Sequence, residues 1–320
     1  MRDTEWFYER GYGIFVHLLA ANVNNPDLPH SFGKHTSWDE CLNDFDCEAF
    51  AEDVKQAGAG YVILTIMQAT KYMLAPNETY NRVTGYKDGE ACPSFDFIDR
   101  VYESLHKRDV DLMLYFTGDG PANDEIAGNA FGYRGFHPNG DKVTKEFVEK
   151  WSEVLREYSL RYGKTVKGWW LDGTPSVIGY DDLELLKIIT DAARAGNEDA
   201  ICACNYFGVL GDYGVVRKQV LCGTPFCDYT AGEMVYFEDV PAAPFIGEQR
   251  WHILTHIGQS ETMYEYDGWA RRGTRYTGEY MRDYYQKVHA HGGVISIDVC
   301  VYRDGHIEPD QIAVLAQMRK

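Results

Sequence analysis

The sequence is poor in basic residues and has no long apolar run. Its 31 Lys and Arg residues stand against 49 Asp and Glu residues, which gives a formal net charge of −18 at pH 7. Such a chain repels phosphate backbones and anionic lipid surfaces, and no stretch of about 18 apolar residues is present that could span a bilayer. We therefore expect neither nucleic acid nor a membrane among its partners.

The first residues lack the features of a secretory signal peptide. Met1 to Glu5 lead directly into WFYERGYGIFVH, without a basic start, an apolar core or a small-residue cleavage site. We expect a cytoplasmic location for the chain as given. Its 320 residues suffice for one large barrel or two ordinary domains, and homo-oligomer formation stays open.

Cysteine pairs with the CxxC spacing of a zinc knuckle are also missing. The eight cysteines are scattered at positions 41, 47, 92, 202, 204, 222, 227 and 300. A chain of this size needs no disulfides, so buried free thiols are the main interpretation. The spacing Cys202-x-Cys204 is one residue too short for a zinc knuckle. His252 and His256 have the i, i+4 spacing of a helix but lack the glutamate of an HExxH motif. We expect no metal site and no cofactor.

Strand-like and helix-like segments alternate along the chain. The apolar runs GIFVH, YVILTI, DLMLYFTGDG, VKGWWLDG and AICACN are separated by helical patterns such as CEAFAEDVKQAGAG, whose last glycine fits a C-cap. Residues 206–265 are irregular, and GEYMRDYYQKVHAHGG, VISIDVCV and EPDQIAVLAQMRK then restore helix, strand and helix. The pattern predicts an α/β protein with one (β/α)8 TIM-like barrel over residues 1–320, irregular in its second half. A doubly wound sheet is the alternative.

Polar residues follow several of the predicted strands. The run VKGWWLDGTPS ends a buried strand with Asp172, and His17, Gln68, Asp119 and Asn205 follow other strands in the same way. Each alone also fits a cap or a hydrogen-bonded core residue. Because active sites of such barrels lie at the C-terminal ends of the strands, together they predict one polar site.

The aromatic residues, which make up 14% of the chain, suggest a class of ligand. Flat rings beside carboxylates suit a sugar, whose C–H face packs on an aromatic surface while its hydroxyls need polar groups. The alternative is that these rings only fill the core and its rim.

Four segments, in the same order, resemble the catalytic domain of the α-L-fucosidases of glycoside hydrolase family 29. WFYERGYGIFVH is similar to that family's W…(K/R)FGIFIHWG, and the segment FDCEAFAEDVKQAGAGYVILT to its F(D/N)…AGAKYVVLT. GWWLDG resembles W-(F/W)-D-G, and the tail GGVISIDVCVYRDGHIEPDQIAVLAQM resembles GGNLLLNIGP-x-x-DG. The resemblance implies that Asp172 is the catalytic nucleophile, that His17 contacts the sugar and that Trp170 forms a wall of its pocket.

The resemblance also implies a glutamate that acts as acid and base. Glu233, in CDYTAGEMVYFED, is the best match to the family's GD-x-x-TPE. The glutamates that stay open as alternatives are Glu238, Glu248, Glu261 and Glu265.

The chain departs from the family at the sugar-binding residues. Where the family has K-H-H-D-G-F, residues 67–72 read MQATKY, and the family's E-W-Y finds its nearest counterpart in TSWDE. The further residues expected to contact the substrate are Trp38, Gln68, Tyr115 and Asn205. The family's C-terminal β-sandwich is not expected here.

These features predict a retaining glycoside hydrolase resembling α-L-fucosidases, which acts on a small glycoside or an oligosaccharide end by double displacement. A site built to bind particular hydroxyls discriminates strongly, so the missing histidines predict a sugar specificity other than fucose. The alternative is a catalytically weakened barrel that binds carbohydrate.

Overall fold

A computed structural model describes residues 2–134, 143–173, 182–205, 226–237, 240–260 and 268–320. The strands are β1 (Tyr12–Val16), β2 (Tyr61–Thr65), β3 (Asp111–Thr117), β4 (Val166–Asp172), β5 (Ile201–Cys204), β6 (Phe245–Ile246), β7 (Gln249–Arg250), β8 (His252–His256) and β9 (Val294–Val299). The longer helices are α4 (Cys47–Ala57), α6 (Phe97–His106), α8 (Lys145–Tyr162), α9 (Leu183–Ala193) and α10 (Gly278–Ala290). The shorter helices are α1 (Glu5–Glu9), α2 (Ala20–Val23), η1 (Pro29–Ser31), α3 (Trp38–Asn43), α5 (Glu78–Thr84), α7 (Glu125–Phe131), η2 (Gly163–Thr165) and α11 (Pro309–Leu315).

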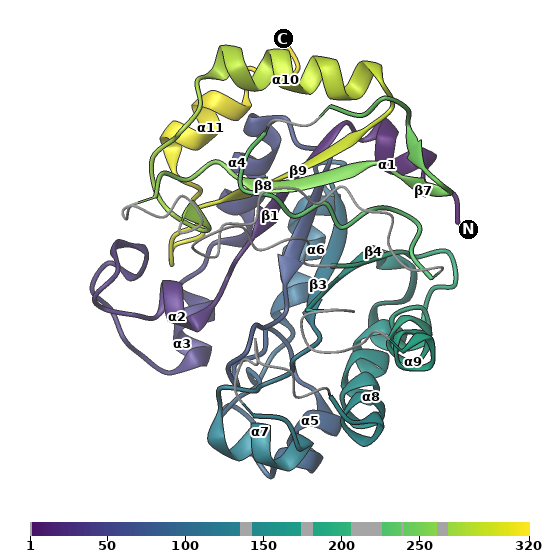
Figure 1. The fold of residues 1–320 in the computed structure, drawn as a ribbon. Helices are drawn as coiled ribbons and strands as arrows, with labels where there is room; N and C mark the ends of the chain where they lie inside the picture. Colours follow the sequence, from purple (N-terminus) through teal and green to yellow (C-terminus); the bar gives the residue numbers. More distant parts are fainter. Residues whose placement is uncertain (1, 135–142, 174–181, 206–225, 238–239, 261–267) are drawn as a thin grey trace.

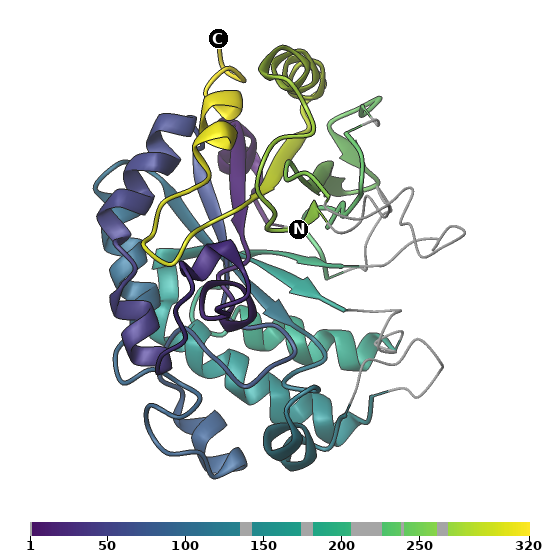
Figure 2. The ribbon, with the colours of Figure 1, turned by 90° about the vertical axis from the view of Figure 1, so that its left-hand side faces the viewer.

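Seven strands form one parallel sheet in the order β5-β4-β3-β2-β1-β9-β8. The first strand therefore pairs with the last, and the order continues around a ring, which a doubly wound sheet does not do. The sheet curls, with helices along its outer side (Figures 1 and 2). This arrangement confirms the predicted α/β barrel.

The eighth position of the ring is irregular. Residues 228–234 lie between β8 and β5, because Met234 N–H donates to Leu254 O of β8 at 2.9 Å and Asp228 N–H donates to Cys202 O of β5 at 2.8 Å. A parallel bridge joins Glu233 to Leu254 of β8. We call residues 228–234 the closing segment. It falls within the region that the sequence predicts to be irregular.

Alternation along the strands explains the adjacent tryptophans of β4. Trp170 points into the barrel with Phe15, Tyr115 and Leu254, whereas Trp169 belongs to the larger core between the sheet and the helices. Successive side chains of a strand point to opposite faces, and both faces of this sheet are covered. Each tryptophan therefore fills a different core.

Local signals place the helices where the sequence predicts them. The carboxylate of Asp46 caps α4 by accepting from Glu48 and Ala49 N–H, and the helix ends at Gly58, whose φ of 93° only glycine adopts easily. α8 and α9 pack together on the outside of the sheet (Figure 1). No helix in the described ranges is long and apolar enough to cross a membrane.

His252 and His256 lie on strand β8 and not on a helix, so their i, i+4 spacing does not bring them to one helix face. The ring of His252 is buried, with Nδ1 2.9 Å from Thr230 O and Nε2 2.8 Å from the Ser296 hydroxyl. It helps to hold the closing segment against β8. The seven cysteines that the structure describes are free thiols, and all but Cys47 are buried. Cys222 lies outside the described residues.

Candidate active site

A cavity of about 480 Å³ opens at the carboxyl ends of the parallel strands. The residues that line it are Phe15, His17, Leu19, Ala21, Asn22, Gln68, Ala69, Thr70, Tyr115, Thr117, Asp119, Asn123, Trp170, Asp172, Gly173, Glu233, Leu254, Trp269 and Ala270. Four of the five polar strand ends that the sequence singles out, all except Asn205, therefore meet at one pocket, which we call the strand-end pocket.

Asp172 is the last residue of β4 and is partly exposed in the strand-end pocket. Its Oδ2 accepts a hydrogen bond from the Tyr115 hydroxyl at 2.6 Å. Its Oδ1 accepts from Gly173 N–H at 2.8 Å and from Asn205 Nδ2 at 2.9 Å. Donors directed at both oxygens stabilise the ionised form of a carboxyl group, which is the form that attacks carbon.

Glu233 is carried by the closing segment and is only 7% exposed. Burial, and then the nearby charge of Asp172, raise the pKa of Glu233 to about 8, while the hydrogen bond from Asn205 acts in the opposite direction. Burial and the neighbouring charge thus both favour the protonated form of Glu233, which is the form that a general acid needs.

Asn205 connects the two carboxyl groups. It follows β5 and is fully buried, and its Nδ2 lies 2.9 Å from Asp172 Oδ1 and 2.5 Å from Glu233 Oε2. These two oxygens can be no farther apart than the sum of the two distances. The sequence predicts Asn205 as a substrate contact, but it is buried and is not among the residues that line the cavity.

Trp170 and Tyr115 form one wall of the strand-end pocket. They stack with ring centroids 5.5 Å apart, and the Trp170 indole N–H donates to Ala231 O at 3.1 Å. Burial and the adjacent Asp172 raise the pKa of Tyr115 well above its ordinary value, so its hydroxyl keeps the proton that it donates. The wall offers an aromatic face beside the carboxyl groups.

His17 is oriented by a partner that the sequence does not single out. Its Nδ1 lies 2.6 Å from Oδ1 of Asp298, a fully buried residue of β9 whose Oδ2 accepts from Ala270 N–H at 2.5 Å. The ring of Trp269, which lines the pocket, lies 5.8 Å from that of His17. The only sequence signal for Asp298 is a carboxylate inside the apolar run VISIDVCV.

Gln68 lines the strand-end pocket, as expected, next to Ala69 and Thr70. Ala69 has a φ of 55°, a left-handed conformation that costs a residue with a Cβ atom roughly 1 kcal/mol or more. The chain holds this turn partly through Asn123 N–H, which donates to Ala69 O at 2.8 Å.

Trp38 does not line this pocket. It is 3% exposed in α3, and its indole N–H donates to Met73 O at 2.6 Å, so the ring packs in the core. Among the alternative glutamates, Glu248 is exposed in the turn between β6 and β7 and is not among the lining residues. Glu238, Glu261 and Glu265 lie outside the described residues.

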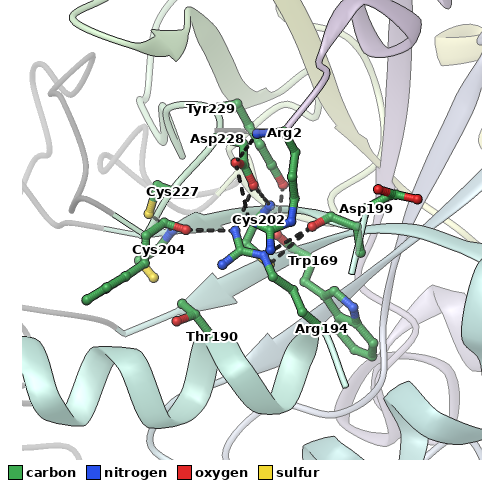
Figure 3. Close-up of polar contacts among 12 residues, drawn as sticks. Arg2, Trp169, Thr190, Arg194, Asp199, Cys202, Cys204, Cys227, Asp228 and Tyr229 are labelled. Carbon is green, nitrogen blue, oxygen red and sulfur yellow. Dashed lines mark hydrogen bonds and ion pairs between the residues drawn. The ribbon is translucent and has the colours of Figure 1, made fainter. Parts of the chain in front are cut away.

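A buried ion pair attaches the closing segment to the rest of the barrel (Figure 3). Asp228, 2% exposed, accepts from Arg194 Nη2 at 2.7 Å and from Cys202 N–H at 3.0 Å through the same oxygen. Its other oxygen accepts from Arg2 N–H at 2.9 Å. We call this group of four residues the Asp228 clamp. It fixes the start of the segment that carries Glu233.

Within the ranges that the structure describes, no group of three or more His, Cys, Asp or Glu side chains is placed to hold a metal ion. The residues of the strand-end pocket instead combine two carboxyl groups in unlike surroundings with an aromatic wall. This combination suits cleavage of a glycosidic bond.

The sequence matches the α-L-fucosidase family over residues 29–320. The chain belongs to this family. It is therefore a glycoside hydrolase resembling the α-L-fucosidases, as predicted, and its substrate is a carbohydrate. No curated protein matches the sequence.

Solved structures with a similar fold include members of two glycosidase families. An endo-fucoidan hydrolase of glycoside hydrolase family 107 has a TM-score of 0.67 at 16% identity, with 99% of this chain and 93% of that chain covered. An α-L-fucosidase of family 29 from Bacteroides thetaiotaomicron has a TM-score of 0.65 at 16% identity, with 99% of this chain and 73% of that chain covered. A covalent intermediate of a fucosidase from the same organism, trapped with 2-fluoro-fucosyl fluoride, has a TM-score of 0.64 at 17% identity, with 99% and 74% covered. At these identities the likeness concerns the fold.

Proposed function

We propose that this protein is a retaining glycoside hydrolase that cleaves a small glycoside or an oligosaccharide end by double displacement. Asp172 is the nucleophile and Glu233 is the acid and base. The observation that carries the proposal is that Asp172 and Glu233 both line the strand-end pocket and both accept a hydrogen bond from the Asn205 amide.

In the first step the Asp172 carboxylate attacks the anomeric carbon, and the bond from this carbon to the leaving oxygen breaks. Glu233 gives its proton to that oxygen and becomes a carboxylate. In the second step Glu233 takes a proton from water, and the resulting hydroxide displaces Asp172 from the same carbon. The free hemiacetal leaves, and both groups return to their starting forms.

The spacing of the two groups favours retention over inversion. Carboxyl groups lie about 5–5.5 Å apart in retaining glycosidases and about 6.5–9.5 Å apart in inverting ones, which hold a water between them. Because Asn205 Nδ2 lies 2.9 Å from Asp172 Oδ1 and 2.5 Å from Glu233 Oε2, these two oxygens are closer together than the inverting range requires. The covalent intermediate trapped in the similar fucosidase supports the same chemistry here.

The sugar bound by this chain differs from fucose in the hydroxyls that the family's paired histidines would hold. Gln68 and Ala69 stand in their place, and only Gln68 has a polar side chain there. Because discrimination follows the buried hydrogen bonds of a site, we expect slow turnover of an aryl α-L-fucoside. A cytoplasmic location stays a prediction, and homo-oligomer formation stays open.

A panel of aryl glycosides, assayed with the native protein and with Asp172→Ala, tests this function. We expect one sugar to be preferred over fucose and Asp172→Ala to lose turnover by at least about 10⁴-fold while it stays folded by circular dichroism. The matched control is Asp99→Ala, an aspartate on α6 that does not line the strand-end pocket. If the native protein binds sugars but hydrolyses none of the panel, the carbohydrate-binding alternative is correct.

A further inference from the structure

The strand-end pocket holds a third carboxyl group that the two-step mechanism does not use. Asp119 lines the same cavity as Asp172 and Glu233, and it is 6% exposed. The Thr117 hydroxyl donates to one of its oxygens. Since burial of a carboxyl group is unfavourable unless it is paired, a third one in this pocket calls for a function.

The loop that carries Asp119 is built into the site. Gly118 N–H donates to Asp172 O at 2.9 Å, and the Trp151 indole donates to Thr117 O at 2.7 Å. Gly120, which follows Asp119, has a φ of 59°. A Cβ atom on Gly120 would lie 3.3 Å from the Phe147 and Trp151 rings. The loop is therefore packed against α8 on one side and attached to β4 on the other.

This loop also contacts the turn that replaces the family's histidine pair. Asn123 N–H donates to Ala69 O, and Gln68, Thr70 and Asp119 line the same cavity. Asp119 thus shares the pocket with Gln68 and Ala69, which replace the family's sugar-binding histidines. Among the described residues that line the cavity, none is Lys or Arg, and the one histidine, His17, is already paired with the buried Asp298.

We propose that Asp119 is a specificity-determining residue that hydrogen-bonds a hydroxyl group of the bound sugar and selects an uncharged sugar over an anionic one. This inference rests on the proposed glycosidase function, whose substrate class it specifies. The Thr117 hydroxyl orients the carboxyl group, and the rigid loop holds it in the pocket.

The protonation of Asp119 agrees with this role. Burial, and to a smaller extent the charge of Asp172, raise the pKa of Asp119 to about 7. The ionisable groups that face it are Asp172 on β4 and Tyr115 on β3. Below that pH the acid donates to a sugar oxygen, and above it the carboxylate repels anions more strongly.

The experiment combines variants of Asp119 with deoxy substrates. kcat/KM is measured for the best aryl glycoside of the panel and for each of its monodeoxy forms, with native protein, Asp119→Asn and Asp119→Leu. We expect one deoxy form to be cleaved about tenfold or more slowly by the native protein, and this ratio to approach one in Asp119→Leu. Asp119→Asn, which keeps a donor, should retain most of the discrimination. Asp99→Asn serves as the control.

Two outcomes overturn the proposal. One is a set of deoxy ratios in Asp119→Leu equal to the native ratios, since a purely structural residue would lower all rates together. The other is a monosulfated form of the substrate that is cleaved faster than the uncharged form. The same comparison is made without turnover by calorimetry, which measures binding of the free sugar and its deoxy forms to Asp172→Ala with and without Asp119→Leu. If the protein binds sugars but does not hydrolyse them, this measurement still tests the role of Asp119.

Discussion

Replacement of Asn205 by alanine tests how the two carboxyl groups work together. During the first step Asp172 loses its negative charge while Glu233 gains one, and the Asn205 amide donates to both. A donor already in place where charge develops stabilises the transition state without reorganisation. A hydrogen bond to a charged group contributes about 1.5–3 kcal/mol. Because about 1.4 kcal/mol corresponds to a tenfold rate change, Asn205→Ala should lower kcat/KM by about 10- to 150-fold.

The pH dependence of Asn205→Ala has a definite sign. The hydrogen bond from Asn205 lowers the pKa of Glu233, so its removal raises this pKa further above about 8. The acid form then persists to higher pH, and the alkaline limb of the kcat/KM profile should move to higher pH although the maximum rate falls. The assay is the pH profile of both proteins on the best aryl glycoside.

Asn197→Ala provides the matched control for this experiment. Asn197 is also buried, and its Nδ2 donates to Val166 O at the start of the same strand, β4, at 3.1 Å. Its loss should reduce stability without moving the pH profile. If Asn205→Ala keeps the native rate and profile, or if its alkaline limb moves to lower pH, the shared-donor argument is refuted.

Two further variants test the acid and its support. Glu233→Ala should cleave substrates with very good leaving groups at near-native rates, fail on poor ones and be rescued by azide with retained configuration. Native behaviour on poor leaving groups would show that another residue is the acid. Asp228→Ala leaves Arg194 buried without its carboxylate partner, so the free energy of unfolding in urea should fall by about 3–5 kcal/mol. The exposed pair of Lys150 and Glu146 on α8 is the control, because Glu146→Ala should leave the free energy of unfolding almost unchanged.

The sequence predicts the parts of this site that depend on local order. Asp172 and Asn205 each follow a continuous apolar run, and parallel strands bring their carboxyl ends to one edge. The alternation of β4 likewise sends Trp170 inward. These features need only a strand and its end.

The remaining parts depend on contacts between distant residues. Asp298 lies inside a strand-like run, and it becomes a site residue only through His17, which is 281 positions away. Trp38 stands in a segment similar to a family motif, but its indole reaches Met73 O, which local sequence does not reveal. The closing segment shows no strand pattern because its start is held by side chains, including a contact from Arg2, 226 positions away. The sequence therefore allows Glu233 to be matched to a family motif, but it does not reveal that Glu233 lies beside Asp172 in the barrel.

The Asp228 clamp implies that the fold and the activity differ in their resistance to heat and denaturant. Seven strands share continuous ladders, whereas on its β5 side the closing segment relies on a few contacts around Asp228. Segments held by few hydrogen bonds open at lower free energy than the ladders around them. Warming or mild denaturant would thus withdraw the acid from the nucleophile while most of the barrel persists. We therefore expect activity to be lost at a lower temperature than the fold, so that the attachment of the closing segment to β5 limits the temperature at which the protein works.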